Sequence, residues 1–432
     1  MAHVESMGSE LNLFEPAVIQ NAVIGEYVQE FAPIATIIQG APIDFQIEGG
    51  GRNYIDLNNS KLEVKVKLTA ADGTANADTV RAGVVNLPLH SLFSTITMKI
   101  ADKVVTETNN LYPYRAYLET LINYQPDVLK TRMLCEGYVE DTTGQVAVTD
   151  PTGANAGLLA REAKFHGSAT VRMIGRIHCD IWHQEKLIPP GIKLEIQLVP
   201  SRPTFFIKTV APTRDLPQVL YKFEIRSARF LMQFKEVAPS MMVAHQKMLQ
   251  EVNYQIPHTK VTMKTHTIPT GVTSFTVDNL FKGRLPDRLA LGMVSDAAAT
   301  GSYSSNPFNF QNFGLNYIAL RVNSELVPRV PMEPNFTTGD YLREYLTVLE
   351  ALGYDIGPNT WSISPTQWAA GFNIYAFKVT PGSIGAVRSN QLTGDIRLDM
   401  KFADALTGNV TLIILSEEPA TLEIDKYGHV FV

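Results

Sequence analysis

The side chains best suited to chemistry lie close together in the segment IHCDIWHQE, residues 177–185. Its potential metal ligands are His178, Cys179, Asp180, His183 and Glu185. Zinc sites usually combine such a close set with a second group of ligands elsewhere in the chain, and no second group is evident. We interpret the segment as a strand end with its polar side chains outward. The sequence therefore predicts no metal site, no cofactor-binding residues and no catalytic residues.

Other motifs also favour structure over chemistry. The chain has no P-loop, G-x-S-x-G, H-E-x-x-H or paired C-x-x-C, and it lacks the His-x-His with which a cupin-type jelly roll holds its metal. Gly49–Gly51 follows a predicted strand, but another strand comes next, so the helix terminus that binds phosphate is missing. A tight turn explains it, and also explains IEGG (47–50), which has the look of a viral maturation-protease site. Three separated carboxylates are interpreted as loop residues: Asp278, Asp287 and Asp296.

The predicted strands and hairpins that must position these residues occur in two similar sets, one in each half of the chain. ITMKIADKVV (96–105) and IALRVNSELV (318–327) both alternate apolar and polar residues, cross a two-residue polar turn and resume with an apolar strand. Alternation with period two around a short turn is typical of a half-buried β-hairpin. GIKLEIQLVPS (191–201) and GDIRLDMKFAD (394–404) form a second matched pair of strands. The offsets of about 200–230 residues indicate that a whole domain is repeated.

Each hairpin is followed by one predicted amphipathic helix. The first segment is NNLYPYRAYLETLINY and the second is TTGDYLREYLTVLEAL, and both contain Arg-x-Tyr-Leu. Apolar residues recur at helical spacing: Tyr114, Tyr117, Leu118 and Leu121, then Leu342, Tyr345, Leu346 and Leu349. Arg115 and Arg343 recur and could carry a site. The periodicity favours a helix that covers an open end or flank of each barrel.

Length and composition agree with two β-domains. A chain of 432 residues exceeds the roughly 250–300 at which single cores stop growing. The 25 prolines and 29 glycines are spread between short alternating runs, which favours an all-β fold. About eight predicted strands per half fit a Greek-key sandwich or a jelly roll, with short inserted helices. The expected units are an N-terminal arm (1–38), a first β-unit (39–208) and a second β-unit with a short C-terminal tail (209–432), divided in the proline-rich stretch 200–218.

Alternation also predicts the buried face of the strands. In KLEVKVKL (61–68) the side chains of Leu62, Val64 and Val66 should face a core, while Lys65 faces outward. Ile396 and Leu398 should be buried in the second unit. Three long polar loops, near 69–83, 141–160 and 295–312, are expected to be exposed and to interlock subunits or form an outer surface.

Charge and hydropathy exclude several classes of protein. The net charge is −6 and no basic tail or stripe occurs, so direct nucleic-acid binding is not expected. Two cysteines are too few for a disulfide scaffold. No signal peptide is visible, and no run of about 20 apolar residues could span a membrane.

Several blocks then carry a resemblance to a known family. They include YIDLNNSKLEVKVKL, NLPLHSLFSTITMKI and FTVDNLFKGRLPDRLALGMV, and SYSSNPFNFQNFGLNYIAL. From about Phe14 to Ile424 the chain resembles the major capsid protein of the Polinton and adintovirus lineage. The resemblance implies a double jelly roll, in which the two β-units are eight-stranded antiparallel β-sandwich barrels with short inserted helices. Adenovirus hexons and virophage capsid proteins share this architecture. The family has no catalytic residues to carry over.

The resemblance implies a structural role. It suggests a homotrimer that forms a pseudo-hexagonal capsomer of an icosahedral DNA-virus shell, assembled in the nucleus or cytoplasm of the host cell and located in the virion capsid. Its partners would be neighbouring capsomers, penton proteins and minor capsid proteins. Two barrels per chain and three chains present six similar walls, which tile a hexagonal lattice.

An alternative is a tandem jelly-roll binding module, such as a lectin or receptor-binding protein. It would need a localised cleft of aromatics and carboxylates. The three tryptophans, Trp182, Trp361 and Trp368, are scattered, and only the last two lie near each other in the sequence. An enzyme ranks third.

Overall fold

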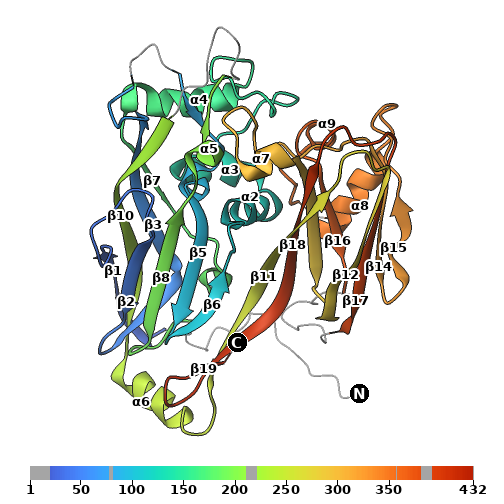
Figure 1. Ribbon diagram of the computed structural model, residues 1–432. Coiled ribbons are helices and arrows are strands. Elements are labelled where there is room, and N and C mark those ends of the chain that lie inside the picture. Colours follow the sequence, from blue (N-terminus) through green and yellow to red (C-terminus); the bar gives the residue numbers. More distant parts are fainter. Residues whose placement is uncertain (1–19, 77–80, 211–220, 357, 381–391, 432) are drawn as a thin grey trace, which may run out of the picture.

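The computed structural model describes residues 20–76, 81–210, 221–356, 358–380 and 392–431. Much of the expected arm, part of the proline-rich stretch 200–218 and Val432 lie outside these ranges. Within them, no helix is long and apolar enough to cross a membrane. Two β-barrels stand side by side (Figure 1), and each consists of two four-stranded antiparallel sheets.

The first barrel combines segments from residue 23 to residue 237. One sheet has the order β1 (Val23–Phe31), β10 (Tyr221–Val237), β3 (Asn53–Ala70) and β7 (Val171–Gly175). The other has the order β2 (Ile43–Glu48), β8 (Lys193–Pro200), β5 (Phe93–Ile100) and β6 (Lys103–Glu107). A separate two-stranded sheet joins β4 (Gly83–Val84) to β9 (Ile207–Lys208).

The second barrel repeats this topology strand for strand. One sheet has the order β11 (Tyr254–Ile268), β18 (Val410–Ile424), β13 (Arg288–Ser295) and β16 (Ile374–Lys378). The other has the order β12 (Ser274–Arg284), β17 (Thr393–Phe402), β14 (Leu315–Val322) and β15 (Glu325–Met332). A short extra strand, β19 (Val430–Phe431), pairs with β18. The predicted all-β fold with two eight-stranded barrels is confirmed.

Short helices occupy the connections. The α-helices are α1 (Pro88–Ser91), α2 (Tyr112–Asn123), α3 (Pro126–Lys130), α4 (Ala156–Phe165), α5 (Pro203–Phe206), α6 (Pro239–Met248), α7 (Asp296–Thr300), α8 (Leu342–Leu352) and α9 (Pro365–Ala369). The 3-10 helices are η2 (Arg132–Glu136), η3 (His166–Ser168) and η4 (Asp180–His183). Helix α2 lies between β6 and β7 in the chain, and α8 lies between β15 and β16. The two Arg-x-Tyr-Leu helices therefore hold equivalent places in the strand order.

Both predicted hairpins form around left-handed turns. The turn residues Ala101 and Asp102 have φ of 46° and 67°, and Asn323 and Ser324 have φ of 49° and 72°. Two consecutive residues with positive φ make the kind of turn whose twist matches that of a β-hairpin. The repeated ten-residue pattern is thus one hairpin, built once in each barrel.

The alternating residues face the cores as predicted. Leu62, Val64, Val66, Ile396 and Leu398 are at most 1% exposed. A strand buries every second side chain when one of its faces lies against a core, so the register follows directly from the sequence pattern. Lys65, on the opposite face of β3, is half-buried.

The strand pairing differs from the expected division at two places. β10, assigned to the second unit by its position after the prolines, pairs with β1 and β3 in the first barrel. β1 lies within the expected arm, yet it is the edge strand of that same sheet. A β-bulge in β10 lies between Ile225 and Ser227. The first barrel therefore extends to Val237, because its last strand pairs with β3 and β1, which lie about 150–215 residues earlier in the chain.

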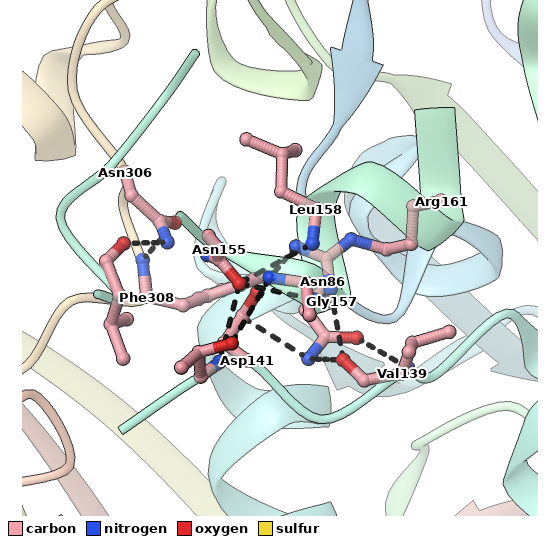
Figure 2. A network of polar contacts seen from close by, with 12 residues as sticks. Asn86, Val139, Asp141, Asn155, Gly157, Leu158, Arg161, Asn306 and Phe308 are labelled. Atoms are coloured by element: carbon pink, nitrogen blue, oxygen red, sulfur yellow. Dashed lines mark hydrogen bonds and ion pairs between the residues drawn. The ribbon is translucent and has the colours of Figure 1, made fainter. Parts of the chain in front are cut away.

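The segment 141–157 is not simply the exposed loop that its small polar residues suggested. Asp141 and Asn155 are buried, and the Asn155 side chain caps α4 by accepting hydrogen bonds from Gly157 and Leu158. Arg161 reaches from α4 to Asp141 with 2.7 Å between Nη2 and Oδ1 (Figure 2). The ion pair between Arg161 and Asp141 and the cap formed by Asn155 hold this segment against the first barrel.

Candidate functional site: the junction between the barrels

Several contacts join the two barrels near α2. Phe308 stacks on Tyr117 with 4.1 Å between ring centroids. Asn306 donates its side-chain amide to the carbonyl oxygen of Val146 at 2.7 Å, in the polar network of Figure 2. The segments near 141–160 and 295–312 therefore join the two barrels of one chain. Their expected role between subunits remains a separate proposal.

The C-terminal end of α2 is covered by the second barrel. Trp361 donates its indole N–H to the carbonyl oxygen of Leu121 at 2.8 Å, and the Tyr354 hydroxyl donates to that of Ile122 at 2.9 Å. These two donors follow α8 in the chain. They satisfy carbonyl groups at a helix end, where no intrahelical partner exists.

A buried ion cluster surrounds Arg115 of α2. Its Nε lies 2.8 Å from Oε1 of Glu119, and its Nη2 lies 2.7 Å from Oδ1 of Asp180. Burial opposes the charge on Arg115, but the two carboxylates raise its pKa above the ordinary value. Burial also opposes ionisation of Glu119, but Arg115 and the hydrogen bond from His178 hold its pKa well below its usual value. Arg115 and Glu119 are therefore both charged at neutral pH.

Three histidines adjoin this cluster. His178 Nδ1 lies 2.5 Å from Oε2 of Glu119, and His90 Nε2 lies 2.9 Å from Oε2 of Glu136. Burial lowers the pKa of His90, which favours its neutral form. His183 contacts Arg176 through Nδ1. A polar cavity of about 310 Å³ opens beside these groups, and Arg288 and Glu417 of the second barrel also line it.

The segment 177–185 is placed differently from the expected strand end. His178, Cys179 and Asp180 are buried, whereas His183 and Glu185 are exposed. The segment turns inward because Asp180 pairs with Arg115 and also accepts a hydrogen bond from the backbone of Val261. Burial raises the pKa of the Cys179 thiol, so this cysteine is no activated nucleophile.

Sequence reasoning missed the residues that complete this cluster. His90 and Glu136 lie about 40–90 residues before His178 and belong to α1 and η2. Neither stands in a recognisable ligand motif. The one usable signal was that Arg115 and Glu119 are four residues apart on a predicted helix.

The remaining sequence candidates have structural roles. Gly49–Gly51 forms the turn between β2 and β3, with Gly51 at φ 63°. Asp287 lies in a loop, as expected. Asp278 lies instead in a bulged part of β12, and Asp296 begins α7. Arg343 is exposed on α8, so the recurring arginines do not form matching sites.

The tryptophans are used inside the protein. Trp182 and Trp368 are fully buried, and Trp361 is 7% exposed. Trp182 donates its indole N–H to the carbonyl oxygen of Ser60, and Trp368 donates to that of Ile374. None of the three lies at an exposed surface where it could stack on a sugar.

Comparison with known proteins agrees with this architecture. No family model matches the chain. Over its whole length it is similar to a chain of the Sputnik virophage structure, with 12% identity, a TM-score of 0.65 and 93% of that chain covered. The fold is the double jelly roll of viral capsid proteins. A PBCV-1 capsid chain gives a TM-score of 0.59 at 9% identity, with 97% of this chain and 99% of that chain covered.

Two further likenesses complete the comparison. The double jelly roll also matches the Faustovirus major capsid protein, with a TM-score of 0.57, 10% identity and coverage of 96% and 93%. In sequence, the chain is 21% identical over 352 residues to "Uncharacterized protein F54H12.2" of Caenorhabditis elegans, which covers 79% of this chain and 80% of that protein. These three structural likenesses are to chains of viral capsids and show the double jelly-roll fold.

A buried lysine provides a pH-dependent test of the junction. Lys208 of β9 donates to the carbonyl oxygens of Thr204, at 3.0 Å, and Ser302, at 2.6 Å. Burial lowers its pKa to about 7, far below the value of 10.5 for an exposed lysine. A neutral amine still has N–H groups for both bonds.

The sign of the effect follows from proton binding. Between pH 7 and pH 10.5 the unfolded chain binds a proton at Lys208 that the folded chain lacks, so the free energy of unfolding should rise with pH across this window. We expect Lys208→Met to remove this rise. Urea unfolding of both proteins at about pH 7 and pH 9.5 measures it. An identical pH dependence in the two would contradict the prediction.

Proposed function

We propose that this protein is the major capsid protein of a DNA virus related to the Polinton and adintovirus lineage. Three chains form a pseudo-hexagonal capsomer, and capsomers tile an icosahedral shell. The fold supports this role, because solved proteins with the same double jelly roll are viral capsid proteins. The site residues contribute to structure, and no catalysis is part of the proposal.

The observation that carries the trimer is a difference between two equivalent helices. All but the last residue of α2 are buried, and its end is covered by the second barrel. In α8 only Glu344, Val348 and Leu352 are buried. The predicted apolar residues Leu342 and Leu346 are 61% and 49% exposed. The sequence pattern is apolar on this face, but none of the residues that the structure describes covers Leu342 and Leu346.

A ring of three chains supplies the missing cover. Two kinds of junction alternate around such a ring. One joins the first and second barrels of the same chain, and the other joins the second barrel of one chain to the first barrel of the next chain. The junction within the chain covers α2. The junction between chains would cover α8 in the same way. Contacts of this head-to-tail kind close when the rotation fits, which gives a finite building block.

The duplication also suggests which surface of the next chain meets α8. Within a chain, α2 contacts the segment that directly follows α8. The equivalent segment after α2 contains α3 and η2, and Leu134 in it is 47% exposed. We place this segment of the next chain against Leu342 and Leu346. The interface between chains should bury more than roughly 2,000 Å² in total.

The finer features follow the same proposal. We place the protein in the virion capsid, after assembly in the nucleus or cytoplasm of the host cell. Neighbouring capsomers, penton proteins and minor capsid proteins are its proposed partners, and direct genome binding is not expected at a net charge of −6. The N-terminal arm and the C-terminal tail would contact neighbouring subunits or an inner layer. We also propose that the division between the two jelly rolls lies after β10, near α6.

Light scattering coupled to size exclusion, with negative-stain microscopy, tests the proposal. We expect a particle of three times the chain mass of 47.8 kDa, with hexagonal outlines. A monodisperse monomer at micromolar concentration would contradict it. That result would favour the alternative of a binding module. The three tryptophans could not form a carbohydrate-binding surface in such a module, because they are buried.

A further inference from the structure

We propose that His90, Glu136 and His178 form a buried binding site for a divalent transition-metal ion of the zinc type. Two imidazoles and one carboxylate are a ligand set that zinc accepts, with a water molecule as the fourth ligand. The proposal does not depend on the capsid role, because all three residues belong to the first barrel.

The three side chains already converge. One ligand atom from each lies within 4.8 Å of the others, and all three residues are buried. The rings of His90 and His178 meet edge to face, with centroids 4.8 Å apart and an interplanar angle of 83°. The residues come from α1, η2 and the segment before η4. An ion here would connect three segments that no strand pairing joins.

Both imidazoles are oriented as metal ligands usually are. A ligating histidine commonly donates its second ring N–H to a carboxylate or another oxygen, which sets the tautomer and the ring orientation. His90 Nδ1 lies 2.8 Å from the hydroxyl oxygen of Tyr112, and His178 Nδ1 lies 2.5 Å from Oε2 of Glu119. Each Nδ1 therefore has an oxygen partner. Nε2 of His178 is left to bind an ion, whereas Nε2 of His90 lies 2.9 Å from Oε2 of Glu136, a contact that an ion bound between the two side chains would replace.

The space for the carboxylate depends on a glycine. A Cβ atom added at Gly175 would lie 2.3 Å from Cγ of Glu136, which is closer than any real contact. Because Gly175, at the end of β7, has no side chain, the Glu136 side chain fits in the interior at this position. There its carboxylate lies beside His90.

A second, overlapping cluster is less suitable. Glu119, His178 and His183 also lie within 4.8 Å of one another. Cations occupy that side, because Arg115 pairs with Glu119 and Arg176 contacts His183. Positive charges this close oppose the binding of a divalent ion. His183 is also exposed, whereas the three ligands of the proposed site are buried.

Metal content of the intact protein is the first test. The full chain, purified from zinc-supplemented cells, should carry about one zinc per chain by elemental analysis. Stripping with a chelator should lower the melting temperature by about 5 °C or more, and added zinc should restore it. Cobalt in place of zinc should give visible absorption of a four-coordinate ion without a thiolate band, because Cys179 is not a ligand.

Matched variants locate the ion. His90→Gln and Glu136→Gln should each lose the metal and the zinc-dependent rise in melting temperature, while His183→Gln keeps both. A wild-type protein with less than about a tenth of a zinc per chain, and no thermal response to zinc, would overturn the proposal whatever the variants do. Loss of the metal in His183→Gln alone would overturn it in favour of the overlapping cluster.

Discussion

Val64→Asp should abolish soluble, folded protein. Val64 is fully buried in the central part of β3, where β10 and β7 flank it on either side. A carboxylate there has no water and no cation to pair with. The cost of burying it, several kcal/mol, is a large part of the stability of a typical domain. Soluble expression and the far-UV circular dichroism of any soluble fraction measure the outcome.

Lys65→Asp is the matched control. Lys65 is the next residue on the same strand, but its side chain points away from the core. Its replacement should change the free energy of unfolding by less than about 1 kcal/mol. Equal tolerance of the two substitutions would show that the register of β3 is wrong, because a shift of one residue exchanges the two faces.

Local patterns account for much of the fold. Alternation located both hairpins and the strands around Val64 and Leu398, because one buried face imposes period two on the sequence. The place of β10 could not be read in this way. Its apolar and polar residues alternate as in any strand, and this local pattern does not identify β1 and β3 as its pairing partners. Prolines near residue 210 marked a boundary between elements, but the boundary between barrels comes one strand later.

The polar cluster was even less accessible to sequence analysis. His178 and Asp180 were recognised as candidates, but their environment depends on Arg115, Glu119 and His90, which arrive from other elements. Spacing along the chain cannot show such convergence. The helix pattern failed for a different reason. It identified Leu342 and Leu346 as apolar, which is correct, but a helix can direct an apolar face to another chain as well as to its own core.

If the proposed trimer forms, the double substitution Leu342→Glu and Leu346→Glu should convert it to monomers that remain folded. Both side chains are largely exposed in the single chain, so their replacement costs little in the monomer. In the proposed ring they are covered by the next chain. Two carboxylates there would lose their hydration without a partner, which costs several kcal/mol for each interface.

Val243→Glu is the control, because Val243 is 65% exposed and belongs to α6. This helix lies at the lower end of the molecule, away from α8 (Figure 1). It should remain trimeric. Light scattering should give about one third of the wild-type mass for the double variant, with an unchanged circular dichroism spectrum. A folded double variant that is still trimeric would exclude α8 from the interface. The uncovered face of α8 would then need a different partner, and the equivalence of the two junctions around the ring would fail.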